Sequence, residues 1–205
     1  MCGIAGILVH KGLPKEEVIN SLAKSLAHRG PDGNGRFDLE KITVLHKRLS
    51  IIDLETGNQP IHGQDGSVIV ANGEIYNFLE LRSNLGEEYF QTRSDSEPPL
   101  RLYTLNGDTF TERLRGMYAI AIVDPNRNEI QLARDPFGIK PLYYVTVGEE
   151  LLFGSEIKAL LTHPEVRAVR DDHALHQYLS LQFCFDDRTL FSGIKKIKPG
   201  HVLDG

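Results

Sequence analysis

The sequence predicts an α+β protein in which antiparallel sheets and helices pack as separate layers. Many short apolar segments are separated by turns rather than by helices, and the helical patterns form groups of their own. Strict alternation of strands and helices would instead have predicted a parallel, doubly wound sheet. The 205 residues are enough for one substantial core, so we expect a single compact domain with antiparallel strand pairing.

The first strand is expected at residues 3–9, a short apolar run that ends at the His10-Lys11-Gly12 turn. Because Cys2 directly precedes this run, it is expected at a strand end. The Asp124-Pro125-Asn126 turn separates two later strands and favours antiparallel neighbours. Further strands are predicted at 42–52, 68–71, 118–123, 129–133, 143–147 and 151–153.

Helical periodicity is clear at residues 15–26, where five apolar side chains share one face. Residues 28–35 contain glycines and a proline that break the pattern, which predicts a loop after this helix. Further helices are predicted at 78–85, 100–105, 110–114, 156–161 and 172–181.

Charge and hydropathy argue against two classes of partner. The net charge is -5 and the basic residues are spread along the chain, so we expect no nucleic-acid partner. No apolar run approaches the roughly 18 residues that a bilayer span requires, and the N-terminus lacks the features of a signal peptide. We therefore expect a cytoplasmic protein that does not bind membranes.

Cys2 follows the initiator methionine, which is usually removed when the next side chain is small. Removal would leave a thiol and a free α-amine on the same residue. Reference pKa values of about 8 for an α-amine and about 8.5 for a thiol allow the amine to accept the thiol proton near neutral pH. Cys2 is therefore a candidate nucleophile that carries its own base, whereas Cys184 is interpreted as an ordinary thiol.

The Asn72-Gly73 dipeptide has two interpretations. Asn-Gly is typical of a hairpin turn, because both residues tolerate positive φ. Residues 75–85 have a helical pattern, however, so the dipeptide could lie at a strand-to-helix turn. There the Asn72 amide and the Gly73 N–H would be two neutral donors able to stabilise a developing oxyanion.

Two charged residues are ambiguous when each is considered alone. Arg48 precedes a β-branched run and could be a solvated arginine at a strand end. Asp95 lies in Ser94-Asp95-Ser96-Glu97, which is typical of a helix N-terminus, although capping and ligand binding are compatible. Pro98-Pro99 follows, so the backbone near Asp95 is expected to be unusual.

Six motifs in chain order make the sequence specific. They are Cys2-Gly3-Ile4-Ala5-Gly6, His28-Arg29-Gly30-Pro31-Asp32-Gly33, Arg48-Leu49-Ser50-Ile51-Ile52-Asp53, Asn72-Gly73-Glu74-Ile75-Tyr76-Asn77, Ser94-Asp95-Ser96-Glu97 and Arg134-Asp135-Pro136-Phe137-Gly138-Ile139-Lys140-Pro141-Leu142-Tyr143-Tyr144. Together they resemble the glutaminase half of asparagine synthetase, a class II glutamine amidotransferase. The resemblance covers essentially the whole chain and implies the four-layer αββα sandwich of N-terminal nucleophile hydrolases.

The resemblance also implies roles for individual residues. Cys2 would attack the side-chain amide of L-glutamine, and Asn72 and Gly73 would form the oxyanion hole.

The remaining roles concern recognition of the substrate. Arg48 would bind the α-carboxylate of glutamine, because a guanidinium matches that group with two parallel hydrogen bonds. Glu74 and Asp95 would face the α-ammonium.

The implied domain covers residues 2–190, and residues 191–205 would begin the connection to a C-terminal synthetase domain absent from this chain. ATP and magnesium are expected only for that domain, since no Ser-Gly-Gly-x-Asp-Ser-like loop occurs here. No cofactor or metal is expected in this chain, because nothing in the sequence completes a ligand set with His173 and His176.

Two alternatives stay open, and so does a homodimer. The chain could be the glutaminase half of another amidotransferase that acts on a sugar or a peptide. It could also be a non-catalytic regulatory module with the same fold.

Overall fold

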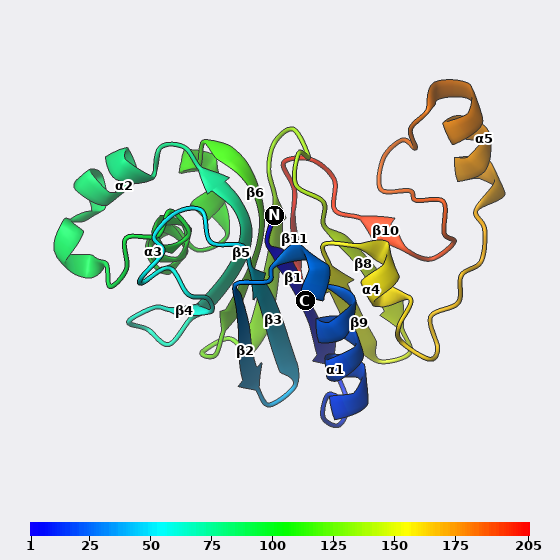
Figure 1. Cartoon of the computed structure of the whole chain (residues 1–205), viewed down its shortest axis with the longest axis horizontal. Helices are drawn as coiled ribbons and strands as arrows, with labels where there is room; N and C mark the ends of the chain where they lie inside the picture. Colours follow the sequence, from blue (N-terminus) through cyan, green and yellow to red (C-terminus); the bar gives the residue numbers. More distant parts are fainter.

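Two antiparallel sheets lie at the centre of the molecule (Figure 1), and the computed structural model describes residues 1–205. The first sheet contains β1 (Gly3–Val9), β2 (Gly33–Leu39), β3 (Ile42–Arg48), β8 (Tyr143–Val147), β9 (Glu150–Gly154) and β10 (Lys195–Lys196). Its strand order is β10-β8-β9-β1-β3-β2. The second sheet contains β4 (Ile61–His62), β5 (Val68–Ile75), β6 (Gly116–Asp124), β7 (Glu129–Arg134) and β11 (Val202–Asp204). Its order is β11-β7-β6-β5-β4.

Helices cover the outer face of each sheet. The first sheet packs against α1 (Glu16–Ser25) and α4 (Ile157–Leu160), and the second packs against α2 (Phe78–Leu85) and α3 (Glu97–Asn106). Short 3-10 segments follow α1, α2 and α3 at Ala27–Arg29, Glu87–Tyr89 and Gly107–Arg113. In Figure 1, α5 (Asp172–Leu181) lies on an arm that extends away from the sheets. The layers give the αββα sandwich expected from the sequence.

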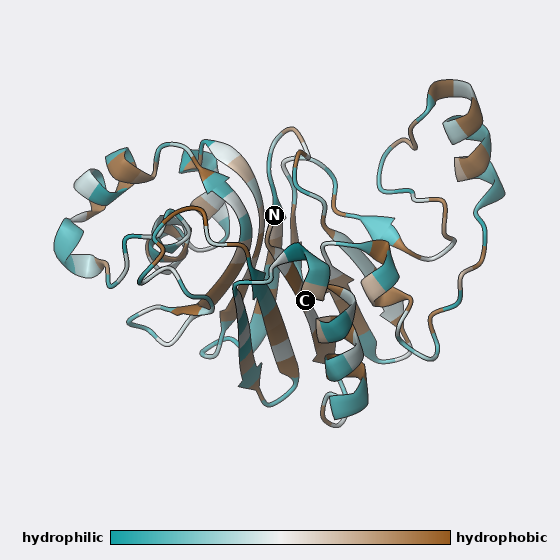
Figure 2. Ribbon diagram, viewed as in Figure 1, coloured by the Kyte–Doolittle hydropathy of each residue, from teal (hydrophilic) through white to brown (hydrophobic).

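Apolar side chains on both faces of the central strands hold these layers together. In β1, Ile4 and Leu8 pack in the cluster between the sheets, whereas Ala5, Ile7 and Val9 pack against the helices. Figure 2 shows the resulting hydrophobic colouring along the central strands. A strand covered on both sides needs apolar residues at every position, which explains why the N-terminal run does not alternate.

Several boundaries differ from the sequence-based expectation, and three of them concern β2, β3 and β5. Residues 33–35, expected in the loop 28–35, instead begin the edge strand β2, whose exposure alternates between its two faces. β3 ends at Arg48 rather than at residue 52, because the segment after it turns back to place its carbonyls around the Arg48 guanidinium. β5 continues to Ile75 rather than ending at 71, since β6 pairs with it along its whole length.

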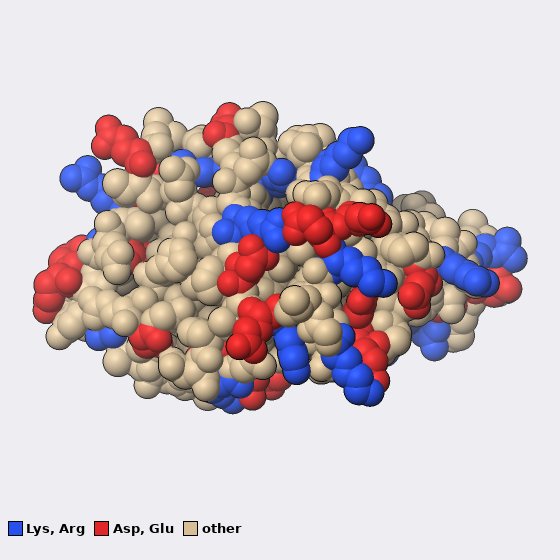
Figure 3. All heavy atoms as spheres, turned by 90° about the horizontal axis from the view of Figure 1, so that it is seen from below, with Lys and Arg blue, Asp and Glu red and all other residues tan.

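Acidic and basic side chains lie side by side on the face shown in Figure 3. None of the helices has both the length and the apolar character needed to cross a membrane.

Candidate active site

A pocket of about 530 Å³, partly open to solvent, lies where the start of β1 meets the end of β3 and the middle of β5. The antiparallel pairing of β1 with β3 sets Gly3 opposite Lys47, so residue 2 lies beside Arg48 at this end of the sheet. All six residues singled out from the sequence line the pocket: Cys2, Arg48, Asn72, Gly73, Glu74 and Asp95.

Cys2 is held through both its side chain and its backbone carbonyl. Its Sγ accepts a hydrogen bond from the Leu49 backbone N at 3.3 Å and lies 3.5 Å from the Leu49 carbonyl oxygen. Its own carbonyl accepts a hydrogen bond from Arg29 Nε at 2.8 Å. The thiol is thus fixed at the pocket wall, and Met1 still occupies its α-amine.

The exposed edge of β5 presents a backbone donor to the pocket. The N–H of Ala71 bonds to Gln59 Oε1 at 2.6 Å, and the N–H of Ile75 bonds to Asp95 Oδ2 at 2.8 Å. Successive N–H groups of a strand alternate between its two edges, so the Gly73 N–H lies between these two and points the same way. It therefore faces the pocket rather than β6.

The Asn72 side chain supplies a second donor. Asn72 is 1% exposed, and its Nδ2 is buried with no hydrogen-bond partner. Burying an amide without a hydrogen-bond partner costs free energy, which makes Asn72 Nδ2 a candidate donor to a bound ligand. Both interpretations of this dipeptide, as a hairpin turn and as a strand-to-helix turn, are wrong, because Asn72 and Gly73 pair with Ala119 and Tyr118 inside the sheet.

Gly73 is needed for the close approach of the two strands. A Cβ atom at this position would lie 2.2 Å from the Met117 carbonyl oxygen and 2.7 Å from Tyr118 Cα. The identity of residue 73 is therefore dictated by packing as well as by any chemical role.

Arg48 is buried, with 7% of its surface exposed. Its Nη1 donates to Asn58 Oδ1 at 2.8 Å, and its Nη2 donates to the Asp53 carbonyl. The segment 49–58 therefore wraps around the guanidinium and fixes its direction. We name it the carboxylate loop, after the α-carboxylate that Arg48 is expected to bind.

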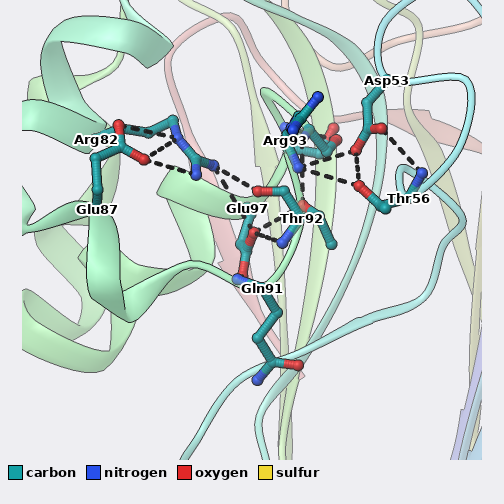
Figure 4. Close-up of polar contacts among 10 residues, drawn as sticks. Asp53, Thr56, Arg82, Glu87, Gln91, Thr92, Arg93 and Glu97 are labelled. Atoms are coloured by element: carbon teal, nitrogen blue, oxygen red, sulfur yellow. Dashed lines mark hydrogen bonds and ion pairs between the residues drawn. The ribbon is translucent and has the colours of Figure 1, made fainter.

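Asp53 joins the carboxylate loop to a second loop, residues 91–96 (Figure 4). We name this second loop the ammonium loop, after the α-ammonium that Asp95 is expected to face. Its carboxylate accepts hydrogen bonds from the Arg93 backbone N and the Thr56 backbone N, both at 2.9 Å. Burial alone would raise the pKa of the Asp53 carboxyl, but hydrogen bonds from Thr56 and Arg93 hold it below its ordinary value. The ionised Asp53 side chain thus connects the two loops through hydrogen bonds.

The ammonium loop is tied to α2 and α3 at its other end (Figure 4). The buried Glu97 carboxylate accepts the backbone N–H groups of Gln91 at 2.7 Å and Thr92 at 2.8 Å. The Thr92 carbonyl accepts a hydrogen bond from Arg82 Nη1 at 2.8 Å, and Arg82 also pairs with Glu87. These charged side chains replace the regular backbone pairing that the loop lacks.

The two acidic residues at the pocket differ in their surroundings. Asp95 is buried and accepts the Ile75 N–H, whereas the half-buried Glu74 carboxylate has no hydrogen-bond partner. Burial raises the pKa of the Asp95 carboxyl, and the neighbouring Glu74 charge adds to the rise. A cation bound between them would relieve both effects.

The Pro98-Pro99 pair leaves this arrangement intact. Both prolines lie in the first turn of α3, where backbone N–H groups have no helical partner, so nothing is lost by their absence.

Two ionisable pocket residues were not proposed as site residues from the sequence. His46 is 1% exposed in β3, and its Nε2 lies 3.2 Å from the Ala71 carbonyl. Since a carbonyl only accepts, Nε2 carries the proton. Burial lowers the pKa of His46 to about 4, so the ring is neutral and joins the two sheets beside Asn72. The other residue is Lys140, and only the fold brings it to the pocket.

Comparison with known proteins identifies the family. A model of the family described as "Glutamine amidotransferase domain" matches residues 1–205. The chain belongs to this family. The amidotransferase domain is 41% identical over 207 residues to asparagine synthetase [glutamine-hydrolyzing] 1 of Bacillus subtilis, covering 98% of this chain and 33% of that protein. It is also 38% identical to "Amidase chry2" of Gibberella zeae, covering 99% of this chain and 32% of that protein.

Solved structures of other enzymes share the fold. The allosteric regulatory enzyme of purine biosynthesis superposes with a TM-score of 0.71 at 20% identity, covering 99% of this chain and 46% of that chain. Glutamine phosphoribosylpyrophosphate amidotransferase from B. subtilis gives 0.65 at 20% identity, covering 99% and 47%. The expected four-layer αββα sandwich is therefore confirmed. The chain spans about a third of the length of the curated relatives it matches.

Proposed function

We propose that this domain hydrolyses L-glutamine to L-glutamate and ammonia, with Cys2 as the nucleophile once Met1 has been removed. One observation carries the proposal: the buried, unpartnered Asn72 Nδ2 lines the same pocket as the Cys2 thiol. A nucleophile and a preorganised neutral donor in one pocket are what acyl transfer requires.

Glutamine would bind with its amide toward Cys2 and its α-carbon toward the two loops. Arg48 would take the α-carboxylate, and Glu74 and Asp95 would take the α-ammonium. The opposite charges of Arg48 and of the two carboxylates at the pocket support this direction of binding.

The reaction would proceed in two steps. The Cys2 Sγ attacks the carbonyl carbon of the side-chain amide (Cδ) while its proton passes to the α-amine of Cys2, and the Asn72 amide and Gly73 N–H stabilise the oxyanion. Collapse of this intermediate returns the proton to the leaving nitrogen, which departs as ammonia and leaves a γ-glutamyl thioester. Water then attacks the thioester, the amine accepts its proton, and glutamate and the free thiol are formed.

The ammonia would be used by a C-terminal, ATP-dependent synthetase domain of the asparagine synthetase type, where ATP and magnesium would bind. This rests on the named synthetases among the relatives and on the share of their length that the chain matches. The similarity to a fungal protein named an amidase favours another acceptor as the second candidate. Residue 190 remains the proposed end of the glutaminase domain, with a cytoplasmic location and a homodimer as further expectations.

The proposal is tested by ammonia release from L-glutamine. Cys2→Ala should abolish release and leave the thermal unfolding temperature close to that of the unchanged protein, whereas Cys184→Ala should release ammonia at the unchanged rate. Undiminished release by Cys2→Ala would exclude the nucleophile. Absence of release from a processed, folded protein would favour the non-catalytic module.

A further inference from the structure

Lys140 is a buried cation without a counter-ion. Only 7% of its surface is exposed, and no carboxylate lies within ion-pair distance of its ammonium. The only polar contact of Nζ is with Met1 Sδ at 3.7 Å. Because lysines are almost never this buried unless they are paired, the charge requires an explanation other than folding.

The backbone of Lys140 is fixed more firmly than its side chain. The buried Asp135 carboxylate accepts N–H groups from Phe137 at 3.1 Å, Ile139 at 2.9 Å and Lys140 at 2.9 Å. Arg134 Nε donates to the Lys140 carbonyl at 2.8 Å. The side chain therefore starts from a rigid loop and ends in the pocket beside residue 1.

The other cation beside the N-terminus is compensated. Arg29 contacts the Cys2 carbonyl, but its guanidinium also forms an ion pair with Glu156 at 2.8 Å. Removal of Met1 would deprive Lys140 of its thioether contact and create a new amine in the pocket that Cys2 and Lys140 both line. Lys140 would then be a positive charge in this pocket without an ion-pair partner.

We propose that Lys140 is a positioning residue that keeps the α-amine of Cys2 unprotonated, and so able to act as a base, at neutral pH. This inference rests on the proposed function. Two neighbouring positive charges disfavour each other, and in a partly buried pocket they are weakly screened. The same charge favours the thiolate over the thiol.

The remaining charged groups at the pocket do not cancel this effect in the substrate complex. Glu74 and Asp95 are negative, but the α-ammonium of bound glutamine would neutralise them, as its α-carboxylate would neutralise Arg48. His46 is neutral, since burial lowers its pKa to about 4. The effect of Lys140 should therefore be visible in the pH dependence of kcat.

The test compares Lys140→Met and Lys140→Gln, which remove the charge, with Lys140→Arg, which keeps it. Lys11→Met is the control, because it removes the same charge at the far end of β1 from an exposed pair with Glu149. Intact mass verifies that Met1 is absent from each protein. The acidic limb of kcat should move up by about one pH unit in the two uncharged variants. It should stay in place in Lys140→Arg and Lys11→Met.

Alkylation of Cys2 by iodoacetamide provides a second readout that needs no turnover. Its pH dependence should shift in the same direction in any uncharged variant that folds. Unshifted profiles in both measurements would overturn the inference, as would an equal shift in Lys140→Arg, which would indicate a purely steric role. Loss of glutaminase in every protein with an intact alkylation shift would reject the proposed function and retain the electrostatic role.

Discussion

The edge of β5 and the two loops beside it contribute to the same pocket in different ways. Residues 72 and 73 lie inside a strand whose other edge pairs with β6 and whose faces are covered. The carboxylate and ammonium loops, 49–58 and 91–96, contain no helix or strand, and Asp53 and Glu97 hold them through hydrogen bonds to backbone N–H groups.

This difference matches what each part is proposed to do. Donors for a transition state must stay in place to a fraction of an ångström, which a paired strand provides. Loops that recognise a substrate must let it enter, and a few charged contacts hold such loops without making them rigid. Changes at residues 72 and 73 should therefore affect kcat or stability, and changes in the loops should affect KM.

The largest effect is expected in β5. Asn72→Ala removes a side-chain donor without altering the backbone pairing, so kcat should fall by about 2.7 to 4 kcal/mol of transition-state stabilisation, roughly 10²- to 10³-fold. Steady-state kinetics with L-glutamine measures it. A change confined to KM would break the comparison, because Asn72 would then belong with the recognition groups.

A pH-dependent effect should come from His46, which joins β3 to β5. The unfolded chain binds a proton below its ordinary pKa of 6.5, but the folded protein does so only near pH 4, so this group lowers stability as the pH falls between those values. The unchanged protein should lose about 2 kcal/mol more than His46→Gln between pH 7 and pH 5. Urea unfolding at the two pH values measures this difference.

His10→Gln is the matched control, since this histidine is exposed at the end of β1. Its loss of stability on acidification should equal that of the unchanged protein. If His46→Gln and His10→Gln lose the same free energy, His46 does not hold the sheets together as a neutral ring.

A smaller effect is expected in the loops. Asp53→Asn keeps a residue that tolerates the left-handed φ of 50° at this position, but replaces one carboxylate oxygen with an NH2 group. The side chain can then accept only one of the Thr56 and Arg93 backbone N–H groups. KM for glutamine should rise about tenfold, with kcat changed less, as expected for the loss of about one charged hydrogen bond.

Asp38→Asn, which loses an exposed pair with Arg36, should leave both constants unchanged. An equal fall of kcat and kcat/KM in Asp53→Asn would mean that the loops also position the reacting end of the substrate.

The sequence predicted the parts that depend on local pattern. Helices 78–85 and 172–181 and strand 143–147 have the expected bounds. The edge strand β2 was missed because it alternates polar residues with glycines, and its strand state depends on β3 beside it. Pairing with β6 likewise extends β5 through Asn72-Gly73, against the local preference for a turn.

The candidate site could likewise be predicted only where local motifs determine it. The motifs singled out six residues that line one pocket, and their individual roles remain proposals. Lys140 could not have been chosen from its motif, because its loop reaches the N-terminus only in the folded protein. There the Asp135 carboxylate accepts hydrogen bonds from four backbone N–H groups. The hydrogen bond from the Arg93 backbone N to Asp53 could not be predicted either, because it joins residues 40 positions apart.

Covalent labelling tests the central claim most directly. The processed protein is incubated with an electrophilic glutamine analogue, such as a γ-glutamyl diazoketone, and the modified residue is identified by peptide mass spectrometry. The account predicts one adduct per chain, on Cys2, that L-glutamine suppresses and that Cys2→Ala lacks. Labelling of Cys184 at an equal rate, or an adduct on Cys2 that glutamine does not suppress, would contradict it.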